Sequence, residues 1–471
     1  MSADPANLSA TELLPLYRKK ALSPVEATRA VLDRINRFEP VINAFCLVDE
    51  EAALAAARAS EARWQRGEPV GLVDGVPTTI KDVVLTKGWP TLRGSRAVDP
   101  NQPWDEDAPP TARLREHGAV LLGKTTTPEF GWKAVTDSAL TGVTRNPWDT
   151  TKTPGGSSGG AAAACALGMG ALHVGSDGGG SIRIPAGFTG IFGLKPSFGR
   201  VPSHPPSPFG TLSHVGPMTR TVADAALMLT VLALPDSRDW FALPYDGRDY
   251  RIGLEDGVRG LRIAFSPDLG FVQDVDPEVA AIVARAVEAF TELGARVEER
   301  DPDFDDPIGI FRPHWYVGAA SLVAGFSEAQ RGRMERGLLE IAAEGAQIPL
   351  MVYVEAMKQR AALGEHMRRF HEDFDLLLTP TLPIPAFEAG REQPDPARHP
   401  RWINWAPFSN PFNLTQQPAA SVPCGFTAAG LPVGLQIIGP MHADHLVLRA
   451  ARAFEAMRPW PTPEAPRQPS G

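Results

Sequence analysis

The 471-residue sequence contains only three cysteines, Cys46, Cys165 and Cys424. Their odd number and the absence of a CxxC pair argue against a disulfide framework and against a structural zinc site, and suit a reducing compartment. No run of 18 consecutive apolar residues occurs, so the sequence predicts no membrane-spanning helix. The N-terminus lacks a basic segment followed by an apolar stretch, and we read no signal peptide there. We therefore expect a soluble, cytoplasmic protein.

Positive charge is also scarce. The 46 basic residues are outnumbered by 55 acidic ones, the net charge is −9, and no long basic run occurs. Such a surface repels phosphate backbones, which argues against a nucleic-acid ligand. His442 and His445 have no acidic or cysteine neighbours in the sequence that would complete a metal site, so we interpret them as solvated residues at a helix start. We expect neither a metal nor a cofactor.

Hydrophobic residues make up 43% of the chain and charged residues 21%, which is ordinary for a globular protein with a large core. Ser23 followed by Pro24 is typical of a helix start, and apolar residues then recur at helical spacing. From residue 76 onward, short apolar strands alternate with helices, which predicts an α/β fold with helices on both faces of a sheet. The expected strands are 119–122, 171–175, 261–265, 296–299, 376–378, 420–423 and 434–438, and the expected helices include 49–66, 161–167, 221–233, 277–293, most of 310–372 and 443–456.

Two glycine-rich clusters carry the candidate chemistry. Residues 153–160 read Thr-Pro-Gly-Gly-Ser-Ser-Gly-Gly, and residues 176–185 read Ser-Asp-Gly-Gly-Gly-Ser-Ile-Arg-Ile-Pro. Flexible linkers have a similar composition, but both clusters lie between apolar structured segments and not at a domain boundary. Glycines let backbone N–H groups turn toward a developing oxyanion, and a serine supplies the attacking oxygen of acyl transfer. The clusters therefore point to nucleophilic catalysis by serine.

A serine nucleophile needs a base, and no histidine lies near either cluster in an informative pattern. His173 falls in an apolar strand, where a packed core histidine is expected. Lys81 ends the β-branched run Val-Pro-Thr-Thr-Ile-Lys at 76–81, so its stem is expected to be buried. Because burial lowers the pKa of an amine, Lys81 is the candidate base.

With these motifs in view, the chain resembles the amidase signature family of hydrolases, over most of its length and least between about 236 and 400. This resemblance implies one large mixed β-sheet covered by helices and a single domain over 1–471. Within it we expect N-terminal helices at 1–66, a catalytic core at 67–235, a variable, partly helical, substrate-facing region at 236–400 and a return to the sheet at 401–471. The matching segments are 75–82, 123–131, 145–149, 154–160, 177–185, 190–196, 418–425 and 431–439.

The resemblance also implies roles for individual residues. Ser181 matches the family's nucleophile, Ser157 its bridging serine on a cis peptide bond, and Lys81 its base. In the implied mechanism Lys81 takes a proton from Ser157 as Ser157 takes one from Ser181, which attacks the carbonyl and forms an acyl-enzyme. The backbone N–H groups expected to hold the oxyanion, and the residues expected to support the site, are those of Gly178, Gly179 and Gly180, and Asp177, Arg183 and Ser158, respectively.

These motifs also fit other classes of protein. Residues 118–125 fit a P-loop pattern, but the phosphate-cradling loop should follow a strand, and here Ala-Val-Leu-Leu is itself the strand. Residues 155–159 fit the nucleophile elbow of α/β-hydrolases, which would make Ser157 the nucleophile. That alternative leaves Lys81 and the second glycine cluster unexplained. A catalytically inactive binding protein on the same fold is disfavoured because all three reactive residues are present.

A further alternative is the glutamine-hydrolysing subunit of an amidotransferase, which shares this signature and works in a complex that binds transfer RNA. A pocket for free glutamine calls for a carboxylate, yet no acidic residue occurs between Asp395 and Asp444. Aromatic residues occur there instead, and they fit either core packing or a pocket for apolar substrates. The candidate pocket residues are Trp132, Trp402, Trp405 and Phe408.

We therefore expect a stand-alone hydrolase, monomeric or homodimeric, that acts on a small apolar or aromatic amide or carbamate (urethane), or on an aryl ester. Gly178 stands where the family has a bulkier residue, Ser176 where threonine is common and Thr126 where asparagine is common. The sequence leaves open whether Gly178 loosens the oxyanion loop or admits a larger acyl group.

Overall fold

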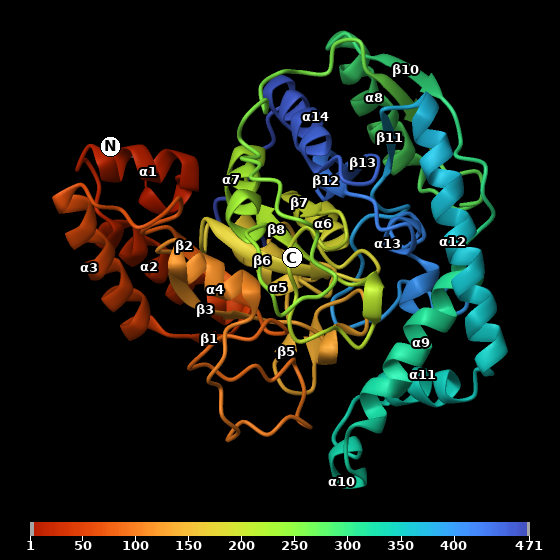
Figure 1. Cartoon of the computed structure of the whole chain (residues 1–471), viewed down its shortest axis with the longest axis horizontal. Helices are drawn as coiled ribbons and strands as arrows, with labels where there is room; N and C mark the ends of the chain where they lie inside the picture. Colours follow the sequence, from red (N-terminus) through yellow and green to blue (C-terminus); the bar gives the residue numbers. More distant parts are fainter. Residues whose placement is uncertain (1–3, 469–471) are drawn as a thin grey trace.

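The computed structural model describes residues 4–468, and within them one large sheet of eleven strands forms the centre of the molecule (Figure 1). The strands are β1 (Phe45–Val48), β2 (Pro77–Lys81), β3 (Val120–Thr125), β6 (Leu172–Asp177), β7 (Phe192–Lys195), β8 (His214–Thr219), β9 (Arg262–Phe265), β10 (Arg296–Glu299), β11 (Leu376–Pro380), β12 (Ala419–Phe426) and β13 (Pro432–Ile438). A separate hairpin consists of β4 (Asp137–Ser138) and β5 (Gly142–Val143).

The sheet is mixed, as the resemblance predicts. Its order is β1-β3-β2-β6-β8-β7-β12-β13-β11-β9-β10. Strand β2 pairs in parallel with both β3 and β6, whereas β12 is antiparallel to both β7 and β13. The carboxyl ends of the parallel neighbours β2 and β6 therefore lie side by side, and this is where the candidate residues are placed.

Helices cover both faces of the sheet, which confirms the predicted α/β class. They are α1 (Ala10–Arg18), α2 (Pro24–Ile42), α3 (Glu50–Arg66), α4 (Pro109–Glu116), α5 (Gly159–Ala166), α6 (Arg183–Thr189), α7 (Val222–Leu232), α8 (Pro277–Glu292), α9 (Ile308–Ala324), α10 (Glu328–Arg331), α11 (Arg336–Ala346), α12 (Leu350–Asp373), α13 (Pro411–Leu414) and α14 (Asp444–Met457). In Figure 1, α1–α3 lie at one end of the molecule and α9–α12 at the other.

Alternation along single strands creates the two cores. In β11, Leu376 and Leu378 face a core that also contains residues of α7, α8 and α14, whereas Leu377 faces the opposite core beside α12 and α13. Successive side chains of a strand point to opposite faces, so a strand covered on both sides is apolar at every position. The two layers of helices follow from this pattern.

The expected helix starts agree with the structure. Ser23 caps α2 by accepting from the N–H of Glu26, whose carboxylate returns to the Ser23 N–H at 2.8 Å. This is a capping box, with Pro24 in the first turn. The strand expected at 296–299 has the bounds of β10, and other boundaries shift by one to three residues.

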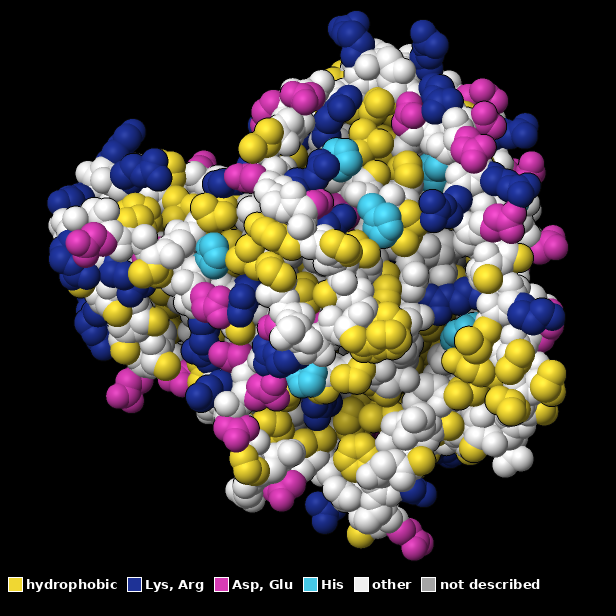
Figure 2. All heavy atoms as spheres, in the orientation of Figure 1, with side chains coloured by type: hydrophobic (Ala, Val, Ile, Leu, Met, Phe, Trp, Pro, Cys, Tyr) yellow, Lys and Arg dark blue, Asp and Glu magenta, His cyan; other side chains and the backbone are white. Residues whose placement is uncertain are grey.

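The region 236–400 contributes strands as well as helices, because β9, β10 and β11 form one edge of the sheet. The division of the chain into one domain with four regions stays a prediction. Among residues 4–468, no single helix is long and apolar enough to cross a membrane. The combination α11 with α12 passes the same test only as a pair, and it is bent by 97°. Leu350, Met351 and Val352 are exposed at the start of α12, over which Figure 2 shows hydrophobic side chains gathered.

Candidate active site

Lys81 is the last residue of β2, and its side chain is fully buried. The Nζ atom lies 2.7 Å from Ser157 Oγ, 2.8 Å from Ser158 Oγ and 3.0 Å from Ser176 Oγ. Burial lowers the pKa of Lys81 well below its ordinary value, and the charge of Asp177 opposes this shift only in part. The amine therefore has a strong bias toward its neutral form, which carries a lone pair able to accept a proton.

The hydrogen bonds around Lys81 limit which hydroxyl can supply that proton. Ser158 Oγ donates to the carbonyl of Ser176 at 3.1 Å and accepts from the Ser176 N–H at 3.2 Å. Since a hydroxyl has one proton, Ser158 can only accept from Lys81. The lone pair of a neutral Lys81 is thus left to the hydroxyls of Ser157 and Ser176, and Ser157 is the nearer of the two.

Ser157 and Ser181 are brought together from the two glycine-rich clusters. Ser157 lies just before α5, and its peptide bond to Gly156 is cis, as the resemblance implies. Ser181 lies in the turn between β6 and α6, where its carbonyl accepts from the N–H of Ser158 at 3.1 Å. Ser157, Ser176 and Ser181 all line one cavity of about 380 Å³.

The turn that carries Ser181 is fixed by a buried ion pair. Arg183 Nε donates to Asp177 Oδ2 at 2.9 Å, and Arg183 Nη2 donates to Asp177 Oδ1 at 3.0 Å. Burial raises the pKa of Asp177, but the charge and hydrogen bonds of Arg183 outweigh it and hold that pKa well below its usual range. The remaining donors of Arg183 reach the C-terminal part of the chain, namely Ser409 O at 3.0 Å, Asn413 Oδ1 at 2.6 Å and Gln436 Oε1 at 2.7 Å.

Asp177 also binds the backbone of the expected oxyanion loop. The N–H of Gly180 donates to Asp177 Oδ1 at 2.7 Å. Gly180 therefore differs from the expectation, because its N–H is already committed to a carboxylate. Of the three glycines, Gly178 and Gly179 are left as the candidate donors. Asp177 and Arg183 take the supporting place that the resemblance implies for them.

The chain is similar over nearly its whole length to known amide-hydrolysing proteins. The family model described as amidase matches residues 26–448. The chain belongs to the amidase family. An acylamidase of Rhodococcus erythropolis is 39% identical over 460 residues, covering 96% of each chain, and a glutamyl-tRNA(Gln) amidotransferase subunit of Myxococcus xanthus (strain DK1622) is 39% identical over 475 residues, covering 95% of this chain and 97% of the relative. The crystal structure of a bacterial aryl acylamidase of the amidase signature enzymes superposes with a TM-score of 0.90 at 33% identity, covering 96% of each chain.

The cavity of this amidase is walled by aromatic residues that the sequence motifs do not indicate. Trp315 of α9 lines it together with Phe130, Phe209 and Phe326. The rings of Trp315 and Phe209 are stacked, with centroids 3.8 Å apart and planes at 9°. Trp315 comes from the region 236–400, which has no motif of its own. The one signal for it is Gly178, a small residue at a position where a bulkier one is usual.

The four aromatic residues predicted for the pocket lie elsewhere. Trp132, Trp402, Trp405 and Phe408 are all buried, and none of them lines the cavity. Trp402 forms a second layer behind the oxyanion loop, because a Cβ added to Gly179 would lie 2.8 Å from its ring. Trp405 stacks on Phe188 in the core, with centroids 6.1 Å apart. Their burial satisfies the hydrophobic effect without any contact with substrate, so core packing is the role that the structure gives them.

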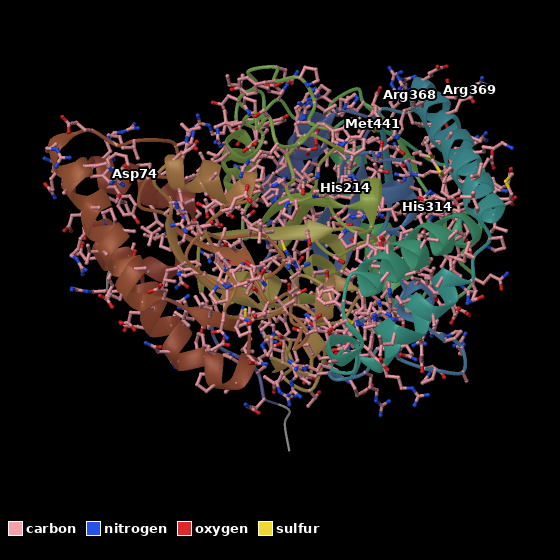
Figure 3. All side chains as sticks on the ribbon, turned by 60° about the horizontal axis from the view of Figure 1, so that its bottom comes forward. Asp74, His214, His314, Arg368, Arg369 and Met441 are labelled. Atoms are coloured by element: carbon pink, nitrogen blue, oxygen red, sulfur yellow. The ribbon has the colours of Figure 1, made fainter. Side chains whose placement is uncertain are left out.

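The remaining chemically interesting residues have structural surroundings. His173 is buried in β6, with Nδ1 2.8 Å from Thr79 Oγ1, and burial lowers its pKa to about 3. His214, labelled in Figure 3, donates from Nδ1 to the carbonyl of Leu212 at 2.8 Å. Lys124 lies inside β3 and donates to the carbonyl of Val84 at 2.7 Å, so the segment that fits a P-loop pattern is a strand. In the part of the chain that the structure describes, no three His, Cys, Asp or Glu side chains form a group that could hold a metal ion.

Proposed function

We propose that this amidase hydrolyses small apolar or aromatic amides through an acyl-enzyme on Ser181, with Ser157 as the proton relay and Lys81 as the base. The observation that carries the proposal is the 2.7 Å contact between Lys81 Nζ and Ser157 Oγ in a fully buried site. A lysine in contact with a hydroxyl and stripped of water is a general base that needs no imidazole. No histidine ring contacts either serine within residues 4–468, which is why we do not propose an α/β-hydrolase mechanism with Ser157 as nucleophile.

The proton moves in two steps. Lys81 accepts the proton of Ser157 while Ser157 accepts that of Ser181, whose oxygen attacks the carbonyl carbon. The negative charge on the carbonyl oxygen is held by the backbone N–H groups of Gly178 and Gly179. The proton then passes back through Ser157 to the leaving nitrogen, the C–N bond breaks, and water hydrolyses the ester on Ser181 by the same relay.

The lining of the cavity supports an apolar substrate over glutamine. Within the described residues no aspartate or glutamate lines the cavity, so the α-amino group of a free amino acid would have no carboxylate partner there. The apolar lining includes Phe130, Phe209 and Trp315. An apolar cavity of 300–1,000 Å³ is the usual size for a small ligand. Carbamates and aryl esters present the same carbonyl to Ser181 and belong to the proposed substrate range.

The second candidate is a glutamine-hydrolysing amidotransferase subunit, because a relative with an amidotransferase name is as similar as the acylamidase. The two candidates differ in substrate and in their need for partners. The first requires turnover of acyl amides by this chain alone, whereas the second requires hydrolysis of glutamine within a complex.

The test is a panel of anilides, alkyl amides, carbamates and nitrophenyl esters, with glutamine, assayed on the purified chain and on its Ser181→Ala and Ser157→Ala variants. We expect turnover of the anilides, no covalent adduct in Ser181→Ala, and labelling of Ser181 by a fluorophosphonate probe, located by mass spectrometry. Hydrolysis of glutamine alone would overturn the substrate proposal. An adduct on Ser157 in the unmodified chain would overturn the assignment of the nucleophile.

A further inference from the structure

Arg93 lies in the loop between β2 and α4, and its side chain lines the cavity that contains Ser157 and Ser181. Its backbone has φ of +54°, a left-handed conformation that non-glycine residues rarely adopt and that clusters at functional sites. Two hydrogen bonds hold this conformation. The carbonyl of Arg93 accepts from the N–H of Phe130 at 2.7 Å, and the N–H of Gly94 donates to Asp82 Oδ2 at 3.3 Å.

This hydrogen bonding ties Arg93 to the reactive centre. The residue after Phe130 is Gly131, and a Cβ added to Gly131 would lie 3.2 Å from Ser157 Oγ. Arg93 and Ser157 therefore border the same wall of the cavity.

The guanidinium of Arg93 has no protein partner. Among residues 4–468, it makes neither a hydrogen bond nor an ion pair within 4.0 Å. The carboxylate that acts on it most strongly is that of Asp82, whose Oδ1 lies 3.6 Å from Lys124 Nζ. Asp82 and Lys124 neutralise each other, so Arg93 contributes an unmatched positive charge. Burial lowers the pKa of Arg93, although a guanidinium remains charged in proteins.

Arg93 also stands out among the residues that line the cavity. Within the described chain it is the permanently charged member of the lining, and most of the other residues are apolar or small. His204 lines the cavity as well, but its Nε2 lies 3.5 Å from Glu106, which would take up its charge. A partly buried charge without a partner costs free energy, and a planar guanidinium binds carboxylates with two parallel hydrogen bonds.

We propose that Arg93 binds a carboxylate carried by the substrate, so that the preferred substrates are apolar or aromatic amides that bear an anionic group. This inference rests on the proposed function of the same site and narrows it. The apolar wall holds the hydrocarbon part, the Ser181 side attacks the amide, and the guanidinium fixes the orientation through the remote carboxylate. Arg93 acts as a specificity residue and takes no part in the proton relay.

The experiment compares matched substrates that differ in one carboxylate. On the acyl side the pair is the 4-nitroanilide of butanoic acid and the mono-4-nitroanilide of succinic acid. On the amine side the pair is acetanilide and 3-acetamidobenzoate. The ratio of kcat/KM for the charged substrate to that for the neutral one is measured in the unmodified chain, in Arg93→Met, in Arg93→Lys and in Arg96→Met. Arg96 is an exposed arginine of the same loop that does not line the cavity, and it serves as the control.

We expect Arg93→Met to lower this ratio roughly 10- to 100-fold for at least one pair, since a charge-assisted hydrogen bond is lost. Arg93→Lys should lower it less, and Arg96→Met should leave it unchanged. An unchanged ratio in Arg93→Met, with the neutral anilides still hydrolysed, would overturn the inference and leave the proposed function standing.

A binding measurement separates the two proposals if no amide is turned over. N-phenylsuccinamate and N-phenylbutanamide are titrated into the Ser181→Ala variant by calorimetry, with and without Arg93→Met. Tighter binding of the charged ligand that disappears with Arg93→Met supports the inference even if hydrolysis fails. Equal binding of both ligands in both variants contradicts it.

Discussion

Trp315 occupies the space that a side chain on Gly178 would need. A Cβ added to Gly178 would lie 3.0 Å from Cζ3 of Trp315, a distance at which one of the two groups must shift. The indole is held from its other side by Phe209, on which it stacks. The small residue at 178 therefore neither loosens the oxyanion loop nor enlarges the cavity, because a ring from α9 fills the gap.

This contact predicts that the two positions depend on each other. Gly178→Thr should lower kcat/KM for an anilide by about tenfold or more, because the new side chain displaces Trp315 or the loop that carries the oxyanion donors. Trp315→Leu in the same chain should restore part of the loss, and steady-state kinetics on the four members of the cycle measure the coupling. Additive effects of the two substitutions would show that the contact has no functional weight.

The dependence of activity on pH should report the protonation of Lys81. Burial lowers the pKa of this amine, and only the neutral form accepts a proton, so kcat/KM should rise with pH through that pKa and then level off well below pH 10.5. The measurement is kcat/KM for a neutral anilide from pH 5 to 10, with the protein's integrity checked at each pH. A rate that keeps rising tenfold per pH unit up to pH 10 contradicts a neutral lysine base.

The pH dependence of stability gives a second view of Lys81. Its pKa is lowered in the folded chain, so the unfolded chain binds more protons between that pKa and the unfolded value of about 10.4. Stability conferred by the native amine, relative to Lys81→Met, should therefore increase with pH, by up to about 1.4 kcal/mol per pH unit in that window. Urea unfolding of both chains at pH 7, 8 and 9 tests the sign, and a difference that is constant or falls with pH would be incompatible with a buried neutral amine.

Removing Arg183 should be costly because it leaves Asp177 charged and unpaired in the core. We expect Arg183→Met to lower the free energy of unfolding by about 3–5 kcal/mol, and also to lower kcat by releasing the turn that carries Ser181. The matched control is Arg369→Met, which removes an exposed pair with Glu365 on α12 (Figure 3) and should cost no more than about 0.5 kcal/mol. Urea unfolding measures both, and a loss at Arg183 as small as at Arg369 would refute the structural role of the buried pair.

The sequence predicted the mixed sheet and the neighbourhood of Lys81 and Ser157 well, for a physical reason. Each of these features is encoded locally, in β-branched runs that end at a functional residue or in glycines that permit one backbone path. The seam between β2 and β6 follows from such runs, because parallel neighbours end at the same edge of a sheet. The two serines are brought near Lys81 by that edge.

The walls of the cavity could not be predicted in the same way. Trp402 and Trp315 are both buried aromatic residues near the oxyanion loop, yet only Trp315 lines the cavity, and the difference depends on how α9 packs. Aromatic content alone does not separate a ring that faces substrate from one that lies a layer behind it. Gly180 shows a similar limit: its N–H is committed to a carboxylate, which no glycine pattern reveals.

The anchoring of Arg183 by Ser409, Asn413 and Gln436 has a consequence for biosynthesis. The nucleophile and its base are translated early, but the groups that lock their turn in place belong to the last part of the polypeptide. While that part is still inside the ribosome, the emerging chain carries a reactive serine without the scaffold that aims it. We therefore expect the enzyme to be inert throughout its own synthesis and to become competent only when β13 joins the sheet.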